Sequence, residues 1–177
     1  MRRNKIIIRL ALDSILSALY FILAFLTVSF GNIHLTFASL VIVFAATAIG
    51  LPDSIGIALL GEFLIQVLSY GITITTPLWI LPPVIRALTI ALFSYFYKRK
   101  KDNIQNHLPV YFFALIFASI LTTLGNTLVM FLDAYIFQYT YAFVIYESII
   151  RLLLGIATAI VIGFINIPLS RTYLHNM

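Results

Sequence analysis

Long apolar segments separated by short polar stretches dominate the pattern of this 177-residue chain. A membrane-spanning helix needs about 20 mainly apolar residues, so each long segment predicts one crossing. The pattern predicts an all-α integral membrane protein, with residues 1–177 forming a single domain of six transmembrane helices. The predicted spans are residues 6–30, 35–50, 54–71, 78–97, 108–132 and 143–170.

Polar breaks between the segments predict where helices end. The second span is the shortest, and Pro52 with Asp53 ends it within a few residues of the third. Residues 72–77 are rich in β-branched side chains, which favour extended backbone and predict a loop. Spans two and three should therefore form a tight antiparallel pair, followed by a loop before span four.

Lysine and arginine in the connections predict the orientation. Loops 31–34, 72–77 and 133–142 contain neither residue, whereas the opposite side collects Arg2, Arg3, Lys5, the basic run 98–101 and Arg171. Cytoplasmic loops of membrane proteins carry the excess of positive charge. Six spans with cytoplasmic N- and C-termini satisfy this rule.

Composition then excludes several classes of protein. The chain is 62% hydrophobic and 10% charged, against about 25% charged in soluble domains. Its net charge of +5 lies in topology-setting positions that contact membrane lipid, so no nucleic-acid partner is predicted. There is no cysteine, no phosphate-binding loop, no zinc-binding HExxH and no GxSxG elbow. We therefore expect no enzyme, no cofactor and no metal site.

Several polar side chains nevertheless fall inside the predicted spans. Counted from the span ends, they all lie between the outer interface and the midplane. Ionisable residues at such depth are candidates for function because their burial is costly. The sequence thus predicts an outward-facing cavity lined by Glu62, Gln66, Trp79, Arg86, Asn126, Glu147 and Arg151.

Each of these residues also has a structural explanation. Glu147 and Arg151 stand four residues apart and could neutralise each other, and Arg86 could pair with Glu62. Trp79 and Tyr70 could anchor the chain at the membrane interface, and Asn126 could bond a neighbouring helix. Their agreement in depth favours a shared cavity.

Two further patterns concern helix geometry. Pro82 and Pro83 remove backbone donors and loosen the first turn of span four, beside the cavity. In span one, Ala11, Ser14 and Ala18 form a face of small residues, which allows another helix to approach closely.

These features together resemble the substrate-binding S component of energy-coupling factor (ECF) vitamin transporters. The stretch GNIHLTFASLVIVFAATAIGLPDSIGIALLGEFLIQVLSYG is similar to that family's first loop and its second and third helices. The stretch TTPLWILPPVIRAL looks like the start of the fourth helix in the branch that includes pantothenate and folate binders. The resemblance covers nearly the whole chain.

The resemblance implies roles for particular residues and partners. It implies a bundle that binds a vitamin from outside and works with a coupling transmembrane subunit and two ATPase subunits. The resemblance implies that Asn32 and His34 lie in the gating first loop and that the family's substrate-binding positions are Trp79, Arg86, Asn126, Glu147 and Arg151. Together with Glu62, Gln66 and Tyr70, these are the predicted substrate-binding residues, and the implied coupling-subunit interface is Ala11, Ser14 and Ala18.

An arginine at mid-depth fits a carboxylate, so pantothenate is the first expected substrate. Hydroxymethylpyrimidine, pyridoxine and folate are the alternatives within the same role. A membrane scaffold of the rod-shape-determining type is the competing class, since such proteins have a similar length and topology.

Overall fold

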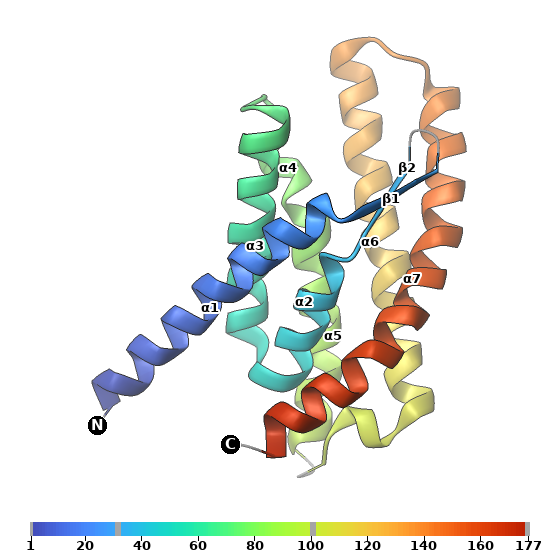
Figure 1. The fold of residues 1–177 in the computed structure, drawn as a ribbon. Coiled ribbons are helices and arrows are strands. Elements are labelled where there is room, and N and C mark those ends of the chain that lie inside the picture. The colour runs from blue at the N-terminus through green and yellow to red at the C-terminus, as the bar shows by residue number, and fades with distance from the viewer. Residues whose placement is uncertain (1, 31–32, 100–101, 176–177) are drawn as a thin grey trace.

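The computed structural model describes residues 2–30, 33–99 and 102–175, and these are nearly all helical (Figure 1). The α-helices are α1 (Arg2–Phe25), α2 (Ser39–Phe44), α3 (Leu51–Ile65), α4 (Thr76–Trp79), α5 (Leu81–Arg99), α6 (Leu108–Phe137) and α7 (Tyr141–His175). Wider π-helical turns, η1 (Ala45–Ile49) and η2 (Gln66–Tyr70), extend α2 and α3, and a short 3₁₀ turn, η3 (Ile104–Asn106), precedes α6. The strands β1 (Thr27–Phe30) and β2 (Ile33–Thr36) form an antiparallel pair.

Five of the six predicted spans correspond to helices that are long and apolar enough to cross a membrane. They are Ile6–Phe25, Leu51–Tyr70, Thr76–Arg99, Leu108–Phe137 and Tyr141–Tyr173. The second predicted span is the exception, because its helix covers only Ser39–Ile49. At 1.5 Å per residue this helix is about 16 Å long, roughly half of a hydrocarbon core. The predicted second span is therefore present as an apolar helix that is shorter than predicted, and the count of six crossings is not confirmed.

The start of that segment is a strand, and so is the end of span one. Span one was predicted to continue to residue 30, but α1 ends at Phe25, and Thr27 pairs with Thr36 across the hairpin. Both strands contain β-branched residues, and a glycine at position 31 separates them in the sequence. The residue types thus favour extended backbone, whereas the average hydropathy of the segment suggested a membrane-spanning helix.

The helices α6 and α7 form a long antiparallel pair, coloured from yellow to red in Figure 1, that approaches closely at two glycines. A Cβ atom on Gly163 would lie 2.6 Å from Phe112 Cε1, and one on Gly155 would lie 2.7 Å from Ser119 Oγ. Small residues of this kind let membrane helices pack backbone to backbone. This pair supplies one wall of the bundle.

Helix α1 runs obliquely across the other helices, and its N-terminus lies away from them (Figure 1). Its buried side chains, Leu16, Ser17 and Tyr20, lie on one face, and the carboxylate of Asp53 binds Arg9 near the start of α3. The predicted small-residue face of Ala11, Ser14 and Ala18 is exposed. It is therefore accessible to a partner helix.

Gly61 is the residue on which Tyr20 packs. A Cβ atom there would lie 2.8 Å from Tyr20 Cγ and 3.2 Å from Tyr20 Cβ, so α1 would have to move. We expect Gly61→Ala to destabilise the protein by about 1–3 kcal/mol, the usual cost of overpacking. Gly56→Ala in the same helix is the matched control, because the added methyl group would have no atom of a packing neighbour within 4 Å.

Alanine at that control position should stabilise the helix by up to about 1 kcal/mol. Thermal unfolding of the two purified variants measures the difference. Equal midpoints for the two variants would show that α1 does not depend on this contact.

The connection between α5 and α6 holds the polar linker of the chain. Asp102 accepts hydrogen bonds from Asn106 Nδ2 at 2.7 Å and from the backbone N–H of Asn103 at 2.7 Å, and it contacts His107 Nε2 at 2.7 Å. The Asn106 bond and then the His107 contact hold the pKa of Asp102 below its usual value.

Both chain termini lie at the end of the molecule where α5 ends (Figure 1).

Candidate functional site: a polar cavity between the helices

A cavity of about 780 Å³ opens between the helices, with residues from every membrane-length helix in its wall. This volume is typical of sites for small molecules. Its polar lining consists of Tyr20, Thr36, Ser39, Glu62, Gln66, Ser69, Tyr70, Thr73, Thr75, Trp79, Arg86, Thr122, Thr123, Asn126, Asp133, Arg151 and Thr158. Apolar side chains such as Ile42, Ile65 and Leu154 complete the wall.

Arg86 reaches this cavity from α5, one turn after Pro82 and Pro83. The helix is interrupted at Ile80, between α4 and α5, as the two prolines predicted. Arg86 Nε donates to Thr122 Oγ1 at 3.3 Å, which is a long hydrogen bond. In the described part of the chain, no carboxylate lies within 4.0 Å of Arg86, so Arg86 forms no ion pair there. The alternative of a direct Arg86–Glu62 ion pair was therefore wrong.

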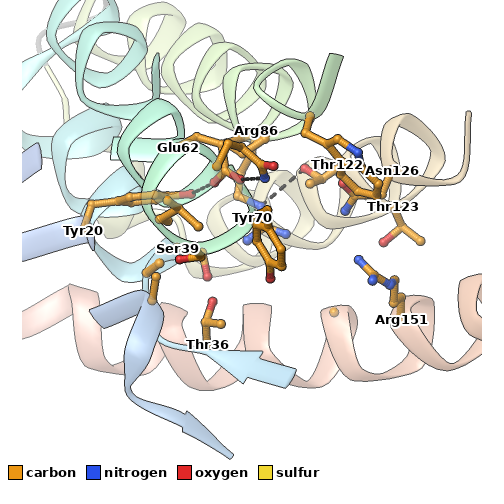
Figure 2. A pocket seen from close by; sticks show the side chains of 18 of the residues that line it. Tyr20, Thr36, Ser39, Glu62, Tyr70, Arg86, Thr122, Thr123, Asn126 and Arg151 are labelled. Atoms are coloured by element: carbon orange, nitrogen blue, oxygen red, sulfur yellow. Dashed lines mark hydrogen bonds between the residues drawn. The ribbon is translucent and has the colours of Figure 1, made fainter. Parts of the chain in front are cut away.

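Glu62 is instead held by two neutral donors. Tyr20 OH donates to one carboxylate oxygen at 2.8 Å, and Gln66 Nε2 donates to the other at 2.8 Å. Glu62, Arg86 and Thr122 gather on one wall in Figure 2, and the Tyr20 side chain reaches Glu62 from α1. Glu62 thus lies near Arg86, but the two side chains do not form an ion pair.

Trp79 and Asp133 form a second polar group of the lining. Trp79 Nε1 donates to Asp133 Oδ2 at 2.9 Å, which joins α4 to α6. Asp133 is buried, and its Oδ1 atom has no hydrogen-bond partner. Trp79 is thus bound to a neighbouring helix and lines the cavity, rather than serving only as an interface anchor.

Arg151 lies opposite, on α7, and is paired within its own helix. Its Nη2 lies 2.6 Å from Glu147 Oε1, and its Nε donates to the same oxygen at 3.0 Å. Glu147 is not in the cavity wall, so its predicted place in the lining was wrong. The i,i+4 spacing allowed this pairing, and the carboxylate is occupied by the arginine.

Of the other predicted residues, Gln66, Tyr70 and Asn126 line the cavity with Glu62, Trp79, Arg86 and Arg151. Asn32 lies outside the described residues, and His34 lies in β2 with a side chain that is also outside them. Whether any of these residues binds a ligand stays a prediction.

Sequence reasoning missed Tyr20, Thr122 and Asp133. Tyr20 resembles a core aromatic residue of span one, and threonine within a helix bonds its own backbone, as Thr122 does to Ala118 O. Asp133 was assigned to an outer loop because span five was ended at residue 132, whereas α6 continues to Phe137. Its charge at a span boundary was the one signal that could have identified it.

This arrangement suits binding rather than catalysis. The described residues contain no group of three or more histidine, cysteine or acidic side chains that could hold a metal ion. The wall instead combines separated charges, amides and hydroxyls with apolar surface, which is the usual composition of a small-molecule site. The fold and the cavity together define a membrane-embedded solute-binding protein.

Comparison with known proteins agrees with this class. The family described as "ECF transporter, substrate-specific component" matches residues 8–172. The chain is also similar to a solved structure described as "Structure and mechanism of the S component of a bacterial ECF transporter", with 23% identity and a TM-score of 0.65. That alignment covers 96% of this chain and 95% of the other, and it supports the fold. No curated protein matches the sequence.

The chain therefore belongs to the family of substrate-specific components of ECF transporters. It is a membrane protein with a substrate-binding role, and not a catalytic enzyme. The resemblance inferred from the sequence is confirmed, and the role of membrane scaffold is set aside.

Proposed function

We propose that this chain is the vitamin-binding S component of an importer in the plasma membrane of a prokaryote. It captures its substrate from outside and works with a coupling transmembrane subunit and two ATPase subunits. The lack of any nucleotide-binding motif supports this division of labour, because the chain cannot supply the energy itself. Cytoplasmic termini, favoured by the positive charges, place the cavity toward the outer face.

The substrate that the cavity fits best is a carboxylate-bearing vitamin, and pantothenate comes first. One observation carries this proposal: Arg86 lines the cavity with one long hydrogen bond to a neutral hydroxyl. A guanidinium has five N–H donors in a planar fork that matches a carboxylate. The remaining donors are therefore available to a ligand, and a carboxylate would supply the direct contact that Glu62, which lies nearby, does not make.

Asn126 and Gln66 support the same assignment. Both amides line the cavity and can donate to or accept from an uncharged polar group of the vitamin. Pyridoxine, hydroxymethylpyrimidine and folate remain the alternative substrates. Folate also has carboxylates, but Trp79 is the single tryptophan of the chain and offers limited stacking surface to a large ring.

The exposed face of Ala11, Ser14 and Ala18 on α1 is the proposed contact with the coupling subunit. Small side chains permit a close approach between helices in a membrane. The three residues are exposed, while Leu16, Ser17 and Tyr20 face the bundle. The helix can thus bind the partner on one side and its own bundle on the other.

A thermal-shift panel of vitamins on the purified chain tests the proposal. A ligand at a thousandfold excess over its Kd stabilises the native state by about 4 kcal/mol. For a chain of this size, such a gain raises the Tm by roughly 8–16 °C. We expect pantothenate to produce this shift and pyridoxine, hydroxymethylpyrimidine, folate and riboflavin to produce little. A panel without any stabilising vitamin would contradict the proposed function.

A further inference from the structure

Asp133 combines burial, charge and an incomplete set of hydrogen bonds. Its exposed fraction is 9%, and its one donor among the described residues is the neutral indole N–H of Trp79. The Oδ1 atom has no partner, and no ion pair involves Asp133 in the described part of the chain. A buried carboxylate normally gathers several donors or a cation, because its transfer out of water is costly.

Arg86 has the opposite charge and a similar deficit. It too lines the cavity, and its one hydrogen bond goes to Thr122. Within the described residues, Arg86 and Asp133 face the same space without pairing with each other or with another charged side chain within 4.0 Å. By contrast, Arg151 is neutralised by Glu147. In the described chain, the cavity therefore presents a guanidinium and a carboxylate that are each without a direct ion-pair contact, although Glu62 lies near Arg86.

Helix α6 gives the spacing of these two ends. Thr122, which contacts Arg86, and Asp133, which contacts Trp79, are eleven residues apart, or about three turns on one face. The axial separation is about 16 Å. Trp79 and Arg86, the partners in the same two contacts, are seven residues apart, or about 10 Å along α4 and α5. Allowing about 3 Å for a hydrogen bond at each end, the two spacings bracket a ligand of about 5–10 Å. Asn126 lies on this face between the two ends, and it lines the cavity beside Thr122 and Thr123 (Figure 2).

From this geometry we propose that Asp133 binds the substrate, which is an extended molecule with a carboxylate at one end and hydroxyl donors at the other. The inference rests on the proposed function and narrows its substrate class. Arg86 binds the carboxylate, Asn126 bonds the polar middle, and Asp133 accepts from the hydroxyl end. Pantothenate has these three groups in this order, whereas a single-ring vitamin reaches only one end at a time.

The first test compares two ligands on two proteins by isothermal titration. Pantothenate is compared with the β-alanine amide of tert-butylacetic acid, which keeps the skeleton and the carboxylate but lacks both hydroxyls. We expect Asp133→Asn to weaken pantothenate at least about tenfold and the dehydroxylated analogue by less than about threefold, since a hydrogen bond to a charged group is lost only with pantothenate. Equal losses for both ligands would overturn the proposal.

The second test needs no ligand, and so it separates this inference from the choice of vitamin. In the ligand-free protein, Asp133→Asn removes an uncompensated charge and should raise the Tm by about 2–4 °C. The matched control is Glu147→Gln, a buried acid that is paired, and it should lower the Tm. A lower Tm for Asp133→Asn would show a structural role and overturn the inference. If no vitamin binds, the proposed substrate fails, and this second test alone decides the role of Asp133.

Discussion

Replacing Arg86 with alanine is expected to weaken the binding of pantothenate by about 100-fold or more. A bidentate contact between guanidinium and carboxylate provides two charge-assisted hydrogen bonds, each about twice as strong as a neutral one. Their loss corresponds to about 3 kcal/mol, because each tenfold change in affinity is about 1.4 kcal/mol. Isothermal titration of the purified protein in detergent measures the change directly.

Pantothenol is the matched ligand for this experiment, because an alcohol replaces the carboxylate and the rest of the molecule is unchanged. Its affinity should fall by less than about threefold in Arg86→Ala, since a neutral hydroxyl gains much less from the guanidinium. The thermal midpoint of the ligand-free variant should not fall, because no carboxylate within 4.0 Å depends on Arg86 in the described chain. Equal losses of affinity for both ligands would refute the assignment of the carboxylate to Arg86.

The depth of polar residues could be predicted from the sequence because a helix rises by a constant amount per residue. Arg86, Asn126 and Gln66 were predicted from their depth to share one cavity, and all three line it. Depth alone could not assign partners, since contacts depend on how each helix is rotated and tilted. Tyr20 reaches Glu62 only because α1 crosses the bundle obliquely, and no periodicity in the sequence records that angle.

Two errors in the predicted fold have a common cause. The strands 27–30 and 33–36 alternate polar with apolar residues and are half β-branched, but they adjoin long apolar segments. A hydropathy window therefore extends span one over the first strand and starts span two within the second. Residue type favoured strands there, while average hydropathy favoured helices. The local preference prevailed because the hairpin can pair its own backbone groups, which a membrane environment demands of any extended segment.

The charged side chains around the cavity fall into two groups according to their hydrogen-bond and ion-pair partners. Arg151 is neutralised by Glu147, and Glu62 has a donor on each oxygen. Arg86 and Asp133 each have one hydrogen bond, to a neutral group, within the part of the chain that the structure describes. Proteins retain such unsatisfied groups chiefly where a ligand completes them, because they reduce stability in its absence. Substitutions at the two kinds of position should therefore have opposite effects on the stability of the empty protein.

The largest loss of stability is expected for Arg151→Ala. Glu147 has an exposed fraction of 7%, so removal of its partner leaves a buried carboxylate without a counter-charge. Breaking a buried ion pair in this way costs about 3 kcal/mol, at the lower end of the usual range because Arg151 is itself partly exposed. For a protein of this size the Tm should fall by roughly 6–12 °C. Thermal unfolding in detergent measures it.

A double-mutant cycle separates this pairing from other effects of the substitution. The combination of Glu147→Gln with Arg151→Ala removes both charges and should recover most of the lost stability. The double variant would then lose less stability than the two single variants together, and this difference is the coupling energy between the two positions. Arg171→Ala is the control on the same helix, because Arg171 is exposed and its loss should change stability by no more than about 0.5 kcal/mol. If the double variant is as unstable as Arg151→Ala, the ion pair is not the source of the loss, and other contacts of the Arg151 side chain must account for it.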